Sequence, residues 1–222
     1  MQMTLPSARQ RGTTLIGLMI GLIISSIVLL ATMMLFQRTG RAMGDARRDA
    51  QVDTQRSAAF LSVDMALQDA GYGIPAAQID AHLVVLKDAN LSGASLTGAK
   101  ATASDIGNAV IWAENTTGHM RCWGLLASNS TGSPELLKLG PVSSCTDASG
   151  FNAHVWTSHV LYNTEATITW SPASCSSFGI APIPPVSGSA PATQKVLLTL
   201  SSKTSNGVAL QTSQCLNNIS SP

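Results

Sequence analysis

Residues 13–36, TTLIGLMIGLIISSIVLLATMMLF, form an apolar run that contains no charged residue and no proline. An α-helix rises about 1.5 Å per residue, so a run of this length can cross the ~30 Å hydrocarbon core of a bilayer. The sequence therefore predicts a membrane-spanning helix at 13–36. Gly17, Gly21 and Ser25 recur every four residues along one face of it, which would allow a second helix to approach closely.

A short basic segment, residues 1–12, precedes the run and carries Arg9 and Arg11 but no acid. Basic residues beside a spanning segment favour the cytoplasm, so we expect a cytoplasmic N-terminus and an exported remainder. A cleaved secretory signal starts in the same way, but its apolar core is usually about 7–15 residues and ends at a small-residue site. The run here is longer and continues into Gln37 and Arg38 without an A-x-A site, so we expect the helix to be retained.

The junction RGTTLIGLMI, residues 11–20, resembles the prepilin segment of type IV pilins. In that family a peptidase cuts after the glycine and methylates the new N-terminus. The resemblance implies cleavage between Gly12 and Thr13 and N-methylation of Thr13. Thr13 stands where the family usually has phenylalanine, and Gly17 stands where most members carry glutamate.

The absence of that glutamate has a physical consequence. In the family the carboxylate is understood to neutralise the N-terminal ammonium of a neighbouring subunit, and an unpaired charge in hydrocarbon is costly. Gly17 cannot supply this partner. Either another group does so, or the subunit occupies a place, such as the fibre tip, where no neighbour's amine needs one.

The chain becomes polar after the apolar run but keeps a helical pattern through residues 37–70. The i, i+3, i+4, i+7 spacing of one buried face is followed by Ala59, Phe60, Val63, Ala66, Leu67 and Ala70. The opposite face would carry polar residues such as Arg56, Asp64, Gln68 and Asp69. Gly71 is placed to cap this amphipathic continuation, and Pro75 prevents the helix from resuming.

The end of this helix, FLSVDMALQDAGYG at residues 60–73, is similar to the segment that closes the long helix in PilW-type minor pilins. Those proteins run from an aromatic residue through alternating Leu and Asp to an A-G-Y-G ending. The resemblance implies a prepilin peptidase as a partner. It also implies assembly with other minor pilins and a major pilin through the N-terminal helix, first in the inner membrane and then in a cell-surface pilus.

Residues 71–222 contain short apolar runs separated by Ser, Thr, Gly, Asn and Pro. We expect strands at 82–87, 109–113, 120–126, 155–162, 166–170, 195–200 and 208–212. The expected fold class is α+β and type IV pilin-like: a long N-terminal helix packed on one mostly antiparallel β-sheet head. Residues 90–104 and the proline-rich 179–193 are expected to be long loops.

All four cysteines lie in the predicted head, at Cys122, Cys145, Cys175 and Cys215. An even number in an exported domain predicts two disulfides in an oxidising compartment. Three pairings are possible, and we favour Cys122 with Cys145 and Cys175 with Cys215 because both close moderate loops. A zinc site that adds His119 or His154 to Cys122 and Cys145 is an alternative that no C-x-x-C or H-x3-H spacing supports.

Histidines and acids are scattered through the head, without a G-x-S-x-G elbow, a Walker loop or an H-E-x-x-H motif. We therefore expect no enzyme, cofactor or metal. The head carries six Lys and Arg against seven Asp and Glu, which offers little footprint for direct nucleic-acid binding.

The expected function is that of a PilW-like minor pilin, which primes or caps a type IV pilus by helix packing. The alternatives are a pseudopilin of a type II secretion system and a membrane-anchored adhesin or binding module. The contact surface of such a module would be residues 179–193.

Overall fold

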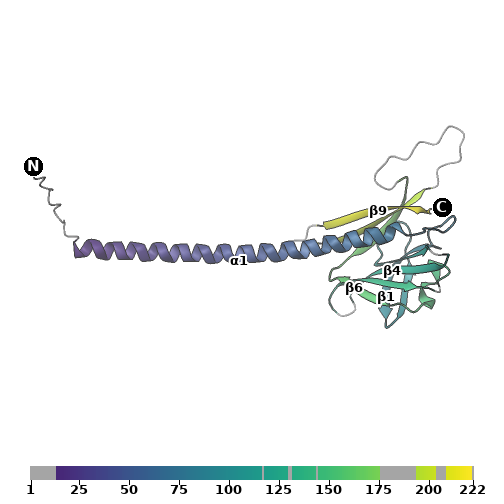
Figure 1. Cartoon of the computed structure of the whole chain (residues 1–222), viewed down its shortest axis with the longest axis horizontal. Helices are drawn as coiled ribbons and strands as arrows, with labels where there is room; N and C mark the ends of the chain where they lie inside the picture. Colours follow the sequence, from purple (N-terminus) through teal and green to yellow (C-terminus); the bar gives the residue numbers. More distant parts are fainter. Residues whose placement is uncertain are drawn as a thin grey trace, which may run out of the picture. The chain divides into compact units, whose positions relative to one another are not determined.

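The computed structural model describes residues 14–116, 118–129, 132–143, 145–175, 194–203 and 209–221. The fold is α+β, as expected: a long helix, α1 (Leu15–Gln68), and two antiparallel sheets of six and three strands (Figure 1). The chain forms two compact units, Met1–Ala50 and Gln51–Pro222, which divide inside α1. The second unit, called the head below, therefore includes the last part of α1.

The larger sheet has the strand order β2-β1-β3-β4-β5-β6, and the smaller has the order β7-β8-β9. The strands are β1 (Leu83–Ser92), β2 (Ser95–Lys100), β3 (Ala109–Asn115), β4 (Met120–Ser128), β5 (Glu135–Val142), β6 (Ser158–Tyr162), β7 (Thr167–Ala173), β8 (Lys195–Lys203) and β9 (Ala209–Ser220). A short 3-10 helix, η1 (Ala148–Ala153), lies between β5 and β6. Strands that are neighbours in the chain pair mostly with each other, which accounts for the antiparallel pattern.

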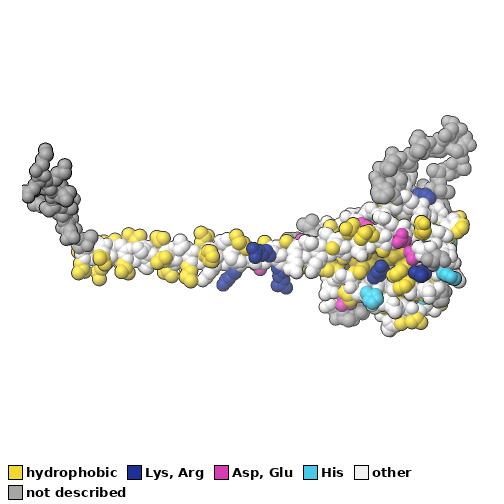
Figure 2. Space-filling view, viewed as in Figure 1, with side chains coloured by type: hydrophobic (Ala, Val, Ile, Leu, Met, Phe, Trp, Pro, Cys, Tyr) yellow, Lys and Arg dark blue, Asp and Glu magenta, His cyan; other side chains and the backbone are white. Residues whose placement is uncertain are grey.

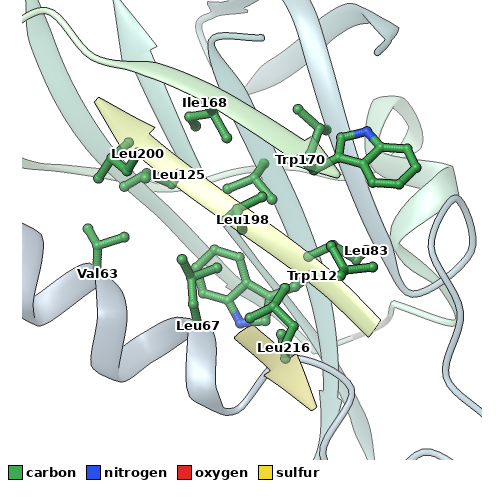
Figure 3. Close-up of a cluster of buried hydrophobic side chains, with 14 of the residues drawn as sticks. Val63, Leu67, Leu83, Trp112, Leu125, Ile168, Trp170, Leu198, Leu200 and Leu216 are labelled. Atoms are coloured by element: carbon green, nitrogen blue, oxygen red, sulfur yellow. The ribbon is translucent and has the colours of Figure 1, made fainter. Parts of the chain in front are cut away.

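Two apolar clusters form the core of the head. In the first, Val63 and Leu67 of α1 pack with β3 and with β7, β8 and β9. Figure 3 shows Leu67 beside Trp112 and Leu216. In the second, η1 and the loop around Cys145 cover the other side of β1, β3 and β4. Strand β3 is accordingly buried from Ala109 through Glu114. The end of α1 is therefore a part of the core and not an attachment to it.

The end of the helix depends on a glycine, as the sequence predicts. Gly71 has a φ of +73°, in the left-handed region that glycine adopts without strain. A Cβ at this position would lie 2.6 Å from Ile219 Cδ1 and 3.1 Å from Ala77 Cβ. The Gly71 amide donates to the Ala113 carbonyl at 2.8 Å, so the turn is joined directly to β3.

Two expectations for the strands were wrong. Residues 90–104 do not form a long loop, because β1 and β2 make a hairpin there with Gly93 in its turn. Strand β2 is almost fully exposed, so it lacks the alternation that marks a half-buried strand. The sequence analysis also missed β5, whose adjacent Leu136 and Leu137 lie at a register shift against β6. The expected loop 179–193 lies outside the described residues.

The expected polar face of α1 was wrong for Arg56. This side chain is buried at 7% exposure, on the same face as Phe60 and Val63. Its guanidinium lies 5.7 Å from the Tyr162 ring centroid, and Nη1 lies 3.4 Å from Asp53 Oδ1. Because the planar guanidinium lies over an aromatic face, an arginine can occupy this buried position on the helix.

Hydrogen bonds join the last part of α1 and the residues just after it to strands of both sheets. Tyr162 Oη donates to the Val52 carbonyl at 3.1 Å, and Thr212 Oγ1 donates to Asp64 Oδ2 at 2.7 Å. Asn218 Nδ2 donates to the Ala70 carbonyl, just beyond the helix, at 3.3 Å. Contacts from β6 and β9 are thus spread along this stretch of the chain.

Burial raises the pKa of Asp64, and the hydrogen bond from Thr212 opposes that rise. The folded state therefore holds the Asp64 proton more tightly than the unfolded state, so this group adds stability as the pH falls through its raised pKa toward 3.8. We expect Asp64→Asn, which keeps an acceptor for Thr212, to remove that gain. Thermal unfolding at pH 7 and pH 4 measures it: the variant should gain less stability than the wild type on acidification. An equal response of the two proteins would contradict this expectation.

Candidate functional site: the apolar helix

One described helix, α1, is long and apolar enough to cross a membrane, through its N-terminal part. Hydrophobic side chains surround this part of the helix, and arginine side chains follow (Figure 2). Residues 14–48 are all exposed. The helix thus has the composition of a single membrane anchor near the N-terminus.

Three hydroxyl groups of this segment are satisfied inside the helix. They donate to carbonyls three or four residues earlier, Ser25 to Gly21, Ser26 to Ile23 and Thr32 to Leu29, at 2.8–2.9 Å. A hydroxyl without a partner is costly in hydrocarbon, where no water can bond to it. Ser25 can therefore lie on the small-residue face without requiring a polar neighbour.

Gly17 and Gly21 have no steric role within the chain. A Cβ on Gly21 would meet nothing within 4 Å, and one on Gly17 would meet only Thr14 Oγ1 at 3.4 Å. The same is true of Gly40 and Gly44, where a Cβ would meet nothing. Glycine inside a helix costs about 1 kcal/mol relative to alanine, so these four residues weaken the helix without relieving a contact within it.

Gly40 and Gly44 repeat the spacing of Gly17 and Gly21, and the sequence analysis missed them because they lie beyond the apolar run. The common spacing of four was the signal that could have found them. On a helix such pairs make shallow hollows where another backbone can come close.

The apolar part of α1 offers no carboxylate. The first acid of the helix is Asp45, and its first turn contains none. After the apolar run come Arg38, Arg41, Arg47 and Arg48. The lack of a carboxylate at Gly17 is therefore not compensated elsewhere in this segment. The proposed cleavage and methylation residues, Gly12 and Thr13, lie outside the described residues.

Both disulfides have the pairing that the loop lengths favoured. Cys122 pairs with Cys145 at a Cα–Cα distance of 5.7 Å, and Cys175 pairs with Cys215 at 5.9 Å. The first is buried in the second core cluster. Because Cys122 and Cys145 are bonded to each other, neither thiolate is available for the alternative zinc site. In the part of the chain that the structure describes, no group of three or more His, Cys, Asp or Glu could hold a metal ion.

The fold and the helix together define a protein with one apolar N-terminal helix and a disulfide-bonded α+β head. Protein-family models, curated proteins and solved structures give no match to this chain. Its function is therefore inferred from its own residues.

Proposed function

We propose that this chain is a minor type IV pilin of the PilW kind, which primes or caps a pilus by packing its N-terminal helix against those of other pilins. The observation that carries the proposal is a set of four glycines in α1 at which, among the described residues, an added Cβ would meet no atom or, at Gly17, only Thr14 Oγ1 at 3.4 Å. The prepilin-like junction at residues 11–20 and the helix ending at residues 60–73 support the same family.

In the proposed mechanism, the chain acts by packing its helix against other helices and catalyses no reaction. Before assembly the apolar helix is surrounded by lipid, and afterwards by similar helices. Lipid tails are as apolar as leucine, so the gain comes from closer van der Waals contact along Gly17, Gly21 and Ser25. The absence of a carboxylate at Gly17 favours a subunit at the tip, where no neighbouring amine needs one. Finding this subunit along the shaft after reconstitution with a major pilin would contradict the tip position.

Two features bear on which side of the membrane the head lies, and they favour opposite sides. Two arginines, Arg9 and Arg11, precede the apolar run, whereas four arginines follow that run between residues 38 and 48. Counting basic residues alone would keep the head in the cytoplasm. The disulfides, including the buried Cys122–Cys145 pair, form and persist in oxidising compartments. We give the disulfides more weight, and we infer that the head lies in the periplasm first and on a surface pilus later.

The N-terminal mass of the protein from membranes, with and without the prepilin peptidase, tests this function. We expect a chain that begins at Thr13 and carries one added methyl, only when the peptidase is present. An intact Met1 start in both strains would overturn the proposal in favour of an anchored binding module. Loss of protein export on deletion, with pili intact, would instead assign the chain to a type II secretion system.

We expect Gly21→Leu to weaken association of the full-length chain with the other minor pilins about tenfold, since a side chain would separate the helices. Energy transfer between labelled chains in vesicles measures this. Ser26→Leu is the matched control, because at 100° per residue it adds similar bulk on the opposite face. An equal effect of the two variants would contradict packing along Gly21.

A further inference from the structure

A small cavity of about 130 Å³ opens on the head beside the end of α1, separate from the apolar helix. It is lined by Ala66 of α1, Asp69 just after α1, Trp112 and Glu114 of β3, Trp123 of β4 and Lys138 of β5. Figure 3 shows the indole of Trp112 next to Leu67, so one wall belongs to the core. The remaining walls bring two acids, a lysine and a second indole together.

Glu114 is a buried carboxylate with few partners. The residue is 7% exposed, and its Oε1 accepts a hydrogen bond from Trp123 Nε1 at 3.0 Å. A carboxylate can accept about four hydrogen bonds. Among the described residues, no basic side-chain nitrogen lies within 4.0 Å of Glu114. Buried charges are costly unless a cation or several hydrogen-bond donors compensate them. The Glu114 carboxylate has a donor in Trp123 but no cationic partner among the described residues.

Lys138 shows where a cation fits in this cavity. Its Nζ lies 4.6 Å from the centroid of the Trp123 ring, a distance typical of a cation–π contact. This nitrogen makes no ion pair with Asp69 or Glu114. The Trp123 ring therefore holds the Lys138 ammonium near its face, and this ammonium does not pair with the Glu114 carboxylate. Asp69 is exposed to solvent, so among the described residues Glu114 is the buried carboxylate of these walls that has no cationic partner.

We propose that this cavity binds one organic cation, an alkylammonium or a guanidinium group, which takes the place of Lys138 over Trp123 and pairs with Glu114 and Asp69. The volume exceeds the ~30 Å³ share of one water, so it can hold a charged head and part of its stem. Such a cation is carried by a free amine or by a lysine or arginine of a protein partner. The proposal does not depend on the function proposed for the helix.

The test follows the indole N–H resonance of Trp123 in the full-length chain in detergent micelles, labelled with 15N-tryptophan. Trp123→Phe identifies the resonance. The probes are n-butylammonium chloride and a blocked tripeptide with one central lysine, at constant ionic strength. Neutral n-butanol is the control for apolar binding.

We expect a saturable shift with both cations and none with n-butanol. Stronger binding of the peptide than of butylammonium would assign the cation to a protein partner, and the reverse would assign it to a free amine. Glu114→Gln keeps an acceptor for Trp123 but should abolish the shift. Glu165→Gln, which changes an exposed carboxylate outside this cavity, should leave it unchanged.

Lys138→Ala gives the sharpest result, because it should strengthen binding about two- to fivefold by removing the competing ammonium. A lysine that contacts the ligand directly would give the opposite sign. Unchanged or weaker binding in Lys138→Ala, or an equal shift with n-butanol, would overturn the proposal.

Discussion

Leu67→Ala is expected to lower the free energy of unfolding of the head by about 2–5 kcal/mol. Leu67 is 1% exposed and lies in the cluster that α1 shares with both sheets. Truncation removes buried methyl groups and leaves a cavity, because β3 and β8 are fixed by their own ladders and cannot close in. For a unit of this size the melting temperature should fall by roughly 5–15 °C.

Thermal unfolding of the full-length chain in detergent micelles, followed by near-ultraviolet circular dichroism, measures this effect. Leu61→Ala is the matched control, since Leu61 lies on the same helix with 60% of its surface exposed. We expect that variant to stay within about 0.5 kcal/mol of the wild type. If Leu67→Ala lowered the free energy of unfolding no more than Leu61→Ala does, this stretch of α1 would not be packed on the sheets.

Removal of the Cys122–Cys145 disulfide by double alanine substitution is the second large expected effect, at about 3 kcal/mol or more. Cross-linking residues 23 apart removes entropy from the unfolded chain, which by the usual loop relation is worth about 3 kcal/mol. Both sulfurs are also buried, at 0% and 4% residue exposure, so their loss leaves space in the second core cluster. Urea unfolding midpoints, with a check that the slope is unchanged, measure the loss.

Double alanine substitution of Cys175 and Cys215 is the matched comparison. Its loop is longer, at 40 residues, but both cysteines are partly exposed. Loop entropy alone would make the Cys175–Cys215 disulfide contribute more to the free energy of unfolding. Packing in the core would instead make Cys122–Cys145 contribute more. We expect packing to dominate. A larger loss from the Cys175–Cys215 variant would show that it does not.

Much of the fold could be predicted because its signals are local. The apolar run, the periodic face with Phe60 and Leu67, and Gly71 define a helix close to the one observed. Strand β7 alternates and was found, and the disulfide pairing followed from loop length. These features can be recognised without knowing which distant residues pack against them.

Other features depend on partners distant in the chain. Strand β2 is an exposed edge that gains its structure from pairing with β1, so its own residues show no pattern. Arg56 is buried because Tyr162, far along the sequence, supplies an aromatic face. The partition of the strands into two sheets likewise depends on pairings between them.

The candidate sites divide in the same way. Gly17, Gly21 and Ser25 could be selected from spacing, because helical spacing fixes which residues share a face. The cavity beside α1 could not be, since Asp69, Glu114, Trp123 and Lys138 come from four separate segments. The cleavage pair Gly12 and Thr13 remains a prediction from sequence resemblance, because it lies outside the described residues.

The hydrogen bonds that join the end of α1 to the strands have a mechanical consequence. Val52, Asp64 and Ala70 each bond to a different side chain, from β6 or β9. A load applied along the helix would act on these bonds in parallel, together with the burial of Phe60 and Leu67. The helix would therefore resist by shear across the whole contact, since no single bond must fail first. If the chain were anchored by the N-terminal part of α1 and pulled, its head should stay folded at a higher tension than a head attached to its helix at one point only.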